Sequence, residues 1–493
     1  MGEQYILVVD QSTQGTKGLL FGENGKLAAR ADIPHRQIVN EKGWVEHDPE
    51  EIMNNTLEVC RHVIRKADIS PKQILAMGIS NQRETSVAWN RDTGKPVCNA
   101  IVWQCARAAG LVRQHQAERE AIRRKTGIPL SPYFPAAKMS WIMENVREAE
   151  ALAGEGRLCL GTVDSWLLYG LTEERVHKTD YSNASRTQLF DIEKLQWDEE
   201  ICKSFQIPRE ALPQVCMSDS CFGHTTLRGF LPRPVPVCGV LGDSHGALFG
   251  QDCRLPGQMK ATYGTGSSVM MNIGDKPLRS HKGIVTSIAW GMEGRVKYVF
   301  EGNLNYTGAV ICWLQNEMGL ISQPGETAQL AKEANPGDRT YFVPAFTGLG
   351  APYWDDRATG MFTGITRTTG RKEMVKACLE CIAYQIADLV ELMGTPKGEK
   401  PQILKADGGP AENDYLMGFQ SDITDIRVCV PEIKELSGMG AAYMAGISAG
   451  FYLPDTIFKG ITYQEYCPSM DRDRRKQLFG GWKQAVERAL IHE

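Results

Sequence analysis

A single carboxylate, Asp243, stands in a glycine-rich stretch, residues 239–250, near the middle of the 493-residue chain. A mostly apolar run, residues 235–241, precedes it, and the small residues that follow are typical of a helix start. A substrate could approach such a turn closely, so Asp243 is a candidate general base. The structural alternative is that Asp243 only caps a helix that begins near His245.

Three polar or glycine-rich turns occur at wide intervals along the chain. Residues 11–16 join two apolar runs in a predicted hairpin, residues 261–268 repeat this pattern, and residues 406–410 lead into a helix predicted from near Asn413. Backbone N–H groups and hydroxyls in such turns suit phosphate, although each turn alone is also typical of an ordinary hairpin or loop. Together they predict two related α/β domains that face each other across a nucleotide.

Polar and aromatic residues follow the predicted strand at residues 74–79. Arg83 and Glu84 can donate to and accept from hydroxyl groups, although a surface ion pair is the more frequent use of such neighbours. Trp103 places an aromatic ring near the same edge, or else belongs to the core. Tyr133 begins a segment that leads from a loop into a helix with a proline in its first turn. These residues are candidates for binding a small hydroxylated molecule.

The composition is that of an ordinary globular protein, with 42% hydrophobic residues, 23% charged residues and a net charge of −4. Because positive charge is not in excess, we expect no nucleic-acid partner and no membrane partner. In addition, no apolar run approaches the roughly 20 residues needed to cross a bilayer. The first residues lack the basic and apolar regions of a signal peptide. A cytoplasmic protein with small-molecule partners is expected.

The length exceeds what one core supports, so two domains are expected. The pattern breaks after Gly250, which places an N-terminal domain at residues 1–250 and a C-terminal domain at residues 251–493. In the second half, residues 373–393 predict an amphipathic helix that packs on a sheet, and its two cysteines are interpreted as packing residues. Residues 438–450 predict a closely packed buried helix.

The motifs, taken in order, resemble the FGGY carbohydrate kinase family, and within it the chain is most similar to the glycerol kinases. The resemblance implies an α/β fold of two ribonuclease-H-like domains, of the actin and hexokinase type, around a central cleft that binds ATP and a sugar or polyol. It covers nearly the whole length and rests on residues 10–13, 81–85, 100–104, 133–145, 161–166, 179–187, 263–266, 351–355 and 407–409.

The resemblance also implies roles for individual residues. Asp243 would take the proton from the attacking hydroxyl, and Asp10 with Asp243 would position Mg²⁺ through water. The positions that match acceptor-binding residues, or lie beside them, are Arg83, Glu84, Trp103, Tyr133, Asp243, Ser244 and Ser268. The positions that match contacts to ATP are Thr13, Lys17, Thr265, Gly308, Gly409 and Asn413.

Four positions depart from the pattern of glycerol kinases. Lys17 stands where they typically have Arg, which keeps the charge but loses the bidentate fork. Ser244 replaces Gln, Ser268 replaces an aromatic residue, and Cys312 replaces a Gln near the nucleotide. The two serines should open the acceptor pocket, so a four- or five-carbon polyol or ketose is the alternative to glycerol. The loop before Val235 also lacks the glycine-and-arginine pattern associated with fructose 1,6-bisphosphate control.

The expected activity is ATP-dependent phosphorylation of a hydroxyl on a small polyol or sugar. Phosphoryl transfer needs alignment, charge neutralisation and a base for the hydroxyl, and the sequence supplies candidates for each. A nucleotide-binding regulator of the same fold is the non-enzymatic alternative, and the presence of both Asp10 and Asp243 favours the enzyme. The sequence is compatible with a homo-oligomer but fixes neither the oligomeric state nor an effector.

Overall fold

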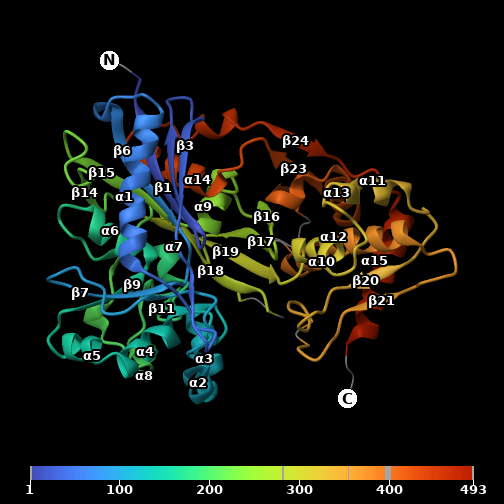
Figure 1. Cartoon of the computed structure of the whole chain (residues 1–493), viewed down its shortest axis with the longest axis horizontal. Helices are drawn as coiled ribbons and strands as arrows, with labels where there is room; N and C mark the ends of the chain where they lie inside the picture. The colour runs from blue at the N-terminus through green and yellow to red at the C-terminus, as the bar shows by residue number, and fades with distance from the viewer. Residues whose placement is uncertain (1–2, 280–282, 354, 395–400, 491–493) are drawn as a thin grey trace.

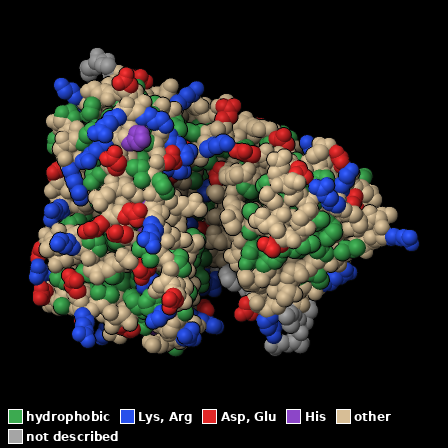
Figure 2. Space-filling model, viewed as in Figure 1, with side chains coloured by type: hydrophobic (Ala, Val, Ile, Leu, Met, Phe, Trp, Pro, Cys, Tyr) green, Lys and Arg blue, Asp and Glu red, His purple; other side chains and the backbone are tan. Residues whose placement is uncertain are grey.

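Two large mixed β-sheets organise the computed structural model, which describes residues 3–279, 283–353, 355–394 and 401–490 (Figure 1). Residue 354, within one of the family motifs, lies outside the described residues. Figure 2 shows that the surface is hollowed between the lobe carrying helices α1 (Pro49–Lys66) and α6 (Val163–Leu171) and the lobe carrying α10 (Gly308–Asn316) and α12 (Arg371–Met393). The predicted two-lobed α/β architecture is confirmed.

The first sheet has six strands. Their order across the sheet is β14 (Gly223–Thr225), β15 (Val235–Gly242), β6 (Ile74–Asn81), β1 (Tyr5–Gln11), β2 (Gly15–Phe21) and β3 (Leu27–Pro34). Every residue of β1 is buried because both faces of the sheet are covered. Leu7 and Val9 face the core shared with α1 and α6, whereas Ile6 and Val8 face the opposite core.

The second sheet has seven strands. Their order is β18 (Val285–Met292), β19 (Arg295–Leu304), β17 (Ser267–Gly274), β16 (Met259–Tyr263), β22 (Ile403–Asp407), β23 (Arg427–Pro431) and β24 (Tyr463–Tyr466). The predicted helix at residues 373–393 is confirmed as α12, which contacts β17 and β19. Cys378 and Cys381 are buried within it as free thiols, as a packing role requires.

The two sheets repeat one topology. In the first, β2 pairs antiparallel with β1, and β6 and β15 continue in parallel. In the second, β17 pairs antiparallel with β16, and β22 and β23 continue in parallel. Both predicted hairpins therefore exist, and each sits at the same place in its sheet. The glycine turns follow the first strands of the repeat, so they lie at corresponding sites.

A helix from the end of the chain covers the first sheet. Helix α14 (Leu436–Ser448) packs on β15, β6 and β1 and on helix α9 (Asp243–Gly250). A Cβ atom added to Gly440 would lie 1.9 Å from the carbonyl oxygen of Gly246, so the two helices touch backbone to backbone. The small residues at 438–450, predicted to form a buried helix, allow the two helix backbones to come this close. The start of α14 therefore lies next to the first hairpin.

A smaller five-stranded sheet completes the first lobe. Its order is β4 (Ile38–Val39), β5 (Val45–His47), β8 (Ala100–Ile101), β7 (Ser86–Asn90) and β9 (Leu158–Thr162), with α4 (Pro135–Asn145) packed near β7. The second lobe adds α11 (Glu326–Glu333), α13 (Asp414–Thr424) and α15 (Arg472–Ala489). Over the described ranges, every helix is too short or too polar to span a membrane.

Candidate active site

Asp243 is the first residue of α9 and directly follows β15. Gly242 occupies the N-cap position and no side chain caps the helix, so the alternative of a purely capping aspartate is wrong. One carboxylate oxygen, Oδ1, accepts a hydrogen bond from the Ser244 N–H at 2.6 Å and lies 3.3 Å from Nε of Arg83. The side chain is 37% exposed, so a reactant can reach the carboxylate.

Asp10 lies near Asp243 because β1 and β15 flank the same strand, β6. Asp10 pairs in register with Ser80, and Leu241 pairs with Ser80 from the other side. The pKa of Asp10 is raised to about 6, mainly by burial and in smaller part by the Asp243 and Glu435 carboxylates, while Lys17 and the Ser80 hydroxyl act in the opposite direction. Crowded negative charge of this kind favours a bound cation. The structure thus brings the two predicted metal-positioning carboxylates to one sheet edge.

A buried set of ion pairs surrounds Arg83 and Glu84. Arg83 donates to both oxygens of Glu301 at 2.9 and 3.0 Å, and Arg186 donates to Glu84 at 2.6 Å and lies 3.1 Å from Glu301. Burial alone would raise the pKa of the Glu301 carboxyl, but Arg186 and Arg83 hold it well below its usual range. Arg83 and Glu84 are therefore not a surface pair, since both are under 10% exposed.

Sequence reasoning assigned no role to two members of this set. Glu301 lies on β19 in the second half of the chain, where a lone acid interrupts a buried apolar strand. Arg186 belongs to the family motif at residues 179–187. The isolated acid in an apolar run was the available signal for Glu301, because a buried carboxylate requires a partner.

An aromatic wall joins the acceptor candidates to the first hairpin. The rings of Trp103 and Tyr133 lie 5.4 Å apart, and Nε1 of Trp103 donates to Oγ1 of Thr13 at 3.0 Å. Trp103 is only partly buried, so the core interpretation of this residue is wrong. Its indole instead connects an acceptor-side ring to the turn predicted to contact phosphates.

Lys138 contacts the loop that carries the Tyr133 ring, and sequence analysis assigned this lysine no role. It lies on α4, is fully buried, and donates to the carbonyl oxygens of Pro132 and Tyr133. Burial lowers the pKa of Lys138 to about 7, with the Glu84 carboxylate acting in the opposite direction. A buried cation near the start of a helix opposes the helix dipole, so its contact with the Tyr133 loop must compensate.

Ser244 and Ser268 come from different lobes. Ser244 is the second residue of α9, and Ser268 lies on β17 opposite Asn303 of β19. Asn303 donates to Glu301 at 3.3 Å, which places Ser268 beside the buried ion pairs. The Oγ atom of Ser268 is buried and has no hydrogen-bond partner among the described residues. An unpaired hydroxyl at this position can serve an incoming polar group.

The second and third glycine turns meet at the start of α10. The N–H of Gly308 donates to the carbonyl of Gly264 at 2.9 Å, and the carbonyl of Thr265 accepts from two N–H groups of the same helix start. A Cβ on Gly308 would lie 2.5 Å from the Gly264 oxygen and 3.6 Å from Pro410. The turns at residues 264–266 and 408–410 are thus neighbours, as a shared nucleotide site requires.

Gly409 and Asn413 bound the third turn. Gly409 opens a short 3₁₀ helix (Gly409–Glu412), and apart from its chain neighbours no atom of the described residues lies within 4 Å of the place where its Cβ would stand. Asn413 caps α13 by accepting from the Leu416 N–H at 3.0 Å, and its amide donates to Thr327 at 3.0 Å. Cys312, one of the departures noted above, is exposed on α10.

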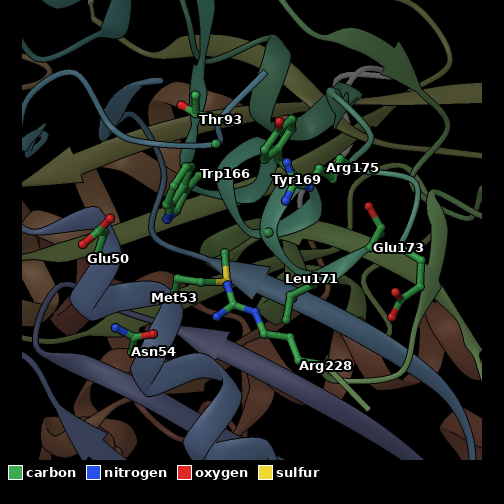
Figure 3. A pocket seen from close by; sticks show the side chains of 13 residues that line it. Glu50, Met53, Asn54, Thr93, Trp166, Tyr169, Leu171, Glu173, Arg175 and Arg228 are labelled. Atoms are coloured by element: carbon green, nitrogen blue, oxygen red, sulfur yellow. The ribbon is translucent and has the colours of Figure 1, made fainter. Parts of the chain in front are cut away.

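A separate cavity of about 530 Å³ lies between α1 and α6, lined partly by Met53, Trp166 and Arg228 (Figure 3). None of the predicted site residues lines it. It lies on the sheet face covered by α1 and α6, whereas Asp243 starts a helix that packs with α14 on the opposite face. Size alone therefore does not identify the active site.

Comparison with known proteins identifies the family. Family models described as "FGGY family of carbohydrate kinases", N-terminal and C-terminal domains, match residues 5–250 and 259–449. The chain belongs to the FGGY family of carbohydrate kinases. It is 46% identical to "Glycerol kinase 1" of Thermotoga maritima over 490 residues, 99% of each chain, and 43% identical to "Glycerol kinase" of Caldanaerobacter subterraneus over 491 residues, also 99% of each.

Solved structures agree. The chain is similar to "Plasmodium falciparum glycerol kinase with ADP", with a TM-score of 0.95, 34% identity, and coverage of 100% of this chain and 99% of that one. A ligand-bound xylulose kinase from Lactobacillus acidophilus matches with a TM-score of 0.87 over 98% and 97% of the chains, at 22% identity, which supports the fold alone. This FGGY kinase is therefore an ATP-dependent enzyme that phosphorylates a hydroxyl of a small polyol or sugar.

Proposed function

We propose that this FGGY kinase phosphorylates glycerol and that Asp243 is its general base. The observation that carries the role of Asp243 is its geometry: a half-exposed carboxylate at a strand end, oriented by Arg83 and the Ser244 N–H. One oxygen is held by these donors while the other remains available to take a hydroxyl proton. The glycerol kinases that match over nearly the full length support glycerol as the acceptor.

Asp10 and Asp243 fit a Mg²⁺ site. Mg²⁺ usually keeps several waters and binds proteins through one or two carboxylates, so a larger ligand cluster is unnecessary. In keeping with this, the described residues hold no group of three or more metal-binding side chains. Burial is the main cause of the raised pKa of Asp10, and the nearby Asp243 and Glu435 carboxylates add negative charge that a divalent cation would neutralise. When bound, Mg²⁺ supplies charge neutralisation for the phosphates.

The remaining roles divide between the two lobes. Arg83 and Glu84, with the Trp103 and Tyr133 rings, would hold the acceptor, since they combine buried hydrogen-bonding groups with apolar walls. Thr13 and Lys17 would contact the phosphates. Residues of the second lobe would hold the rest of the nucleotide: Thr265, Gly308, Gly409 and Asn413. This assignment makes residues 1–250 the acceptor and base domain and residues 251–493 the nucleotide domain.

A cytoplasmic location belongs to the same proposal. All 14 cysteines are free, including the buried Cys60 and Cys253, whose thiol pKa values burial raises to about 12. Inert, unpaired thiols are typical of a reducing compartment. A homo-oligomer remains compatible with the chain, and light scattering of the purified protein measures its mass.

Coupled release of ADP tests the proposed function. The purified enzyme would be screened with ATP and Mg²⁺ against glycerol, four-carbon polyols and pentuloses. Glycerol should give the highest kcat/KM, and Mg²⁺ removal should abolish turnover. If no acceptor is phosphorylated although ATP binds, the chain is a nucleotide-binding regulator and the enzyme hypothesis is refuted.

A four- or five-carbon acceptor is the second candidate, favoured by Ser244 and by the unpaired hydroxyl of Ser268. Two small hydroxylated side chains leave room for a longer molecule and can hydrogen-bond it. The double variant Ser244→Gln/Ser268→Phe should then shift preference toward glycerol by about 1–3 kcal/mol. If the native enzyme already prefers glycerol, this candidate is excluded and neighbouring groups must fill the space.

A further inference from the structure

Five charged side chains meet where the first hairpin touches the start of α14. Asp10 and Lys17 oppose each other on β1 and β2, and Lys17 opposes Asp32 on β3. Arg30 lies two residues before Asp32 and so on the same face of the sheet. Glu435, the residue before α14, lies over this face and is only 6% exposed.

Two cations share the Glu435 carboxylate. Its Oε2 atom accepts from Nζ of Lys17 at 2.7 Å, and its Oε1 atom is bonded by Nη1 of Arg30. The other side of the Arg30 guanidinium is held by Asp32, which accepts from Nε and Nη2 at 2.7 to 3.0 Å. Arg30 is therefore fixed in one orientation by two carboxylates.

Lys17 lies between two buried carboxylates. Its ammonium is 2.7 Å from Glu435 and 3.7 Å from Asp10. An ammonium has three donors and no planar fork, so each donor that it gives to a carboxylate leaves one fewer for the phosphate oxygens. If Arg30 were absent, the negative charge of Glu435 would be neutralised mainly by Lys17. With Arg30 present, one oxygen of Glu435 is already paired.

We propose that Arg30 is a positioning residue for phosphoryl transfer, because it pairs with Glu435 and so keeps the Lys17 ammonium available for the phosphates of ATP. The inference rests on the proposed function, in which Lys17 contacts those phosphates. Glu435 orients the Lys17 ammonium. Because Arg30 also pairs with Glu435, it weakens the attraction between Glu435 and Lys17. The three side chains come from β2, β3 and the start of α14, so the arrangement exists only in the folded chain.

Arg30→Gln tests this role, with Arg36→Gln as a matched control at an exposed arginine six residues further along. Loss of one charged hydrogen bond corresponds to roughly tenfold or more, so kcat/KM for ATP should fall by that factor. The KM for the acceptor should stay near the native value, and Arg36→Gln should behave as the native enzyme. A native kcat/KM for ATP in Arg30→Gln overturns the inference.

The same substitution made in a second variant distinguishes a positioning role of Arg30 from a role in folding. An arginine at position 17 has five donors and can bond carboxylates and phosphate together. Arg30→Gln should therefore lower kcat/KM for ATP much less in a chain that already carries Lys17→Arg. An equal loss in both backgrounds, or a fall in Tm that accounts for the whole effect, would assign Arg30 a structural role only. Absence of turnover in the native enzyme would instead refute the proposed function.

Discussion

The acceptor side and the nucleotide side of this kinase are built from different groups. On the acceptor side, Arg83, Glu84, Arg186 and Glu301 bond one another in a buried set that joins the two halves of the chain. On the nucleotide side, the glycine turns near Gly308 are held by backbone hydrogen bonds. Side chains define the first region and the backbone defines the second.

The difference follows from what each region would bind. A small polyol presents a few hydroxyls, so it needs donors and acceptors that are already fixed by their own partners. Phosphates present many equivalent oxygens, which backbone N–H groups in turns can meet without side-chain specificity. Substitutions in the acceptor-side ion pairs should therefore change charge balance and stability, whereas those at the glycine turns of the second lobe should act through shape.

The largest expected effect is loss of the base. Asp243→Asn should lower kcat by about 10² to 10⁴, since it removes the proton acceptor but preserves the size of the side chain. ATP affinity, measured by titration calorimetry, should remain close to native because the phosphate turns are unchanged. Native turnover in this variant would show that another group takes the proton.

Glu301→Gln tests whether the acceptor side depends on buried charge. Removing one partner of a buried pair leaves Arg83 and Arg186 without their shared carboxylate and should cost about 3–5 kcal/mol of unfolding free energy. Denaturant unfolding measures this cost, with Glu293→Gln in the exposed turn before β19 as the control. Equal stability of the two variants would mean that these ion pairs contribute little.

The pH dependence of that difference has a definite sign. The pKa of Glu301 in the folded protein lies below its ordinary value of 4.5, so its contribution is present above pH 4.5 and is lost as the pH falls further. The stability difference between native and Glu301→Gln chains should be full at pH 7 and shrink in acid. A difference that stays constant down to about pH 3, where roughly 95% of free glutamates are protonated, would contradict the assignment.

The sequence could predict the turns but not the partners. Residues near in sequence, such as those of the first hairpin and the Asn413 cap, follow from local patterns of apolar runs and turn formers. Glu301, Arg186 and Glu435 act through contacts more than 100 residues away, which local patterns do not encode. Family motifs identified Arg83 and Asp243, but only the fold shows which charges neutralise them.

A smaller effect is expected at Lys138, which supports the acceptor wall without belonging to it. Lys138→Met keeps the length but leaves the carbonyls of Pro132 and Tyr133 without a donor, so the KM for the acceptor should rise about tenfold. The KM for ATP should change less than the acceptor KM. Parallel changes in both constants would indicate a general loss of structure.

Lys138 also predicts a pH effect on stability. Burial lowers its pKa to about 7 from an ordinary value of 10.5, so the folded chain holds fewer protons than the unfolded chain between these values. Stability should therefore rise with pH across this window in the native chain, relative to Lys138→Met. Chemical denaturation at pH 6.5 and pH 9, chosen to lie on roughly either side of the lower value, measures the change. An unchanged difference would place the lysine pKa outside this window.

The smallest effect is expected on the nucleotide side, at Gly409, and it isolates shape from stability. Within the described part of the chain, and apart from the two chain neighbours, no atom lies within 4 Å of the position of an added methyl group, so Gly409→Ala should leave Tm unchanged. Gly418 on α13 offers the same free space and serves as the control, where alanine should stabilise the helix by about 0.5–1 kcal/mol. If the nucleotide lies against the third turn, only Gly409→Ala should raise the KM for ATP, by about threefold to tenfold, which corresponds to about 0.7–1.4 kcal/mol. Because the protein itself has room for the methyl group, a raised KM can come only from the nucleotide, and an unchanged KM would place ATP away from this turn.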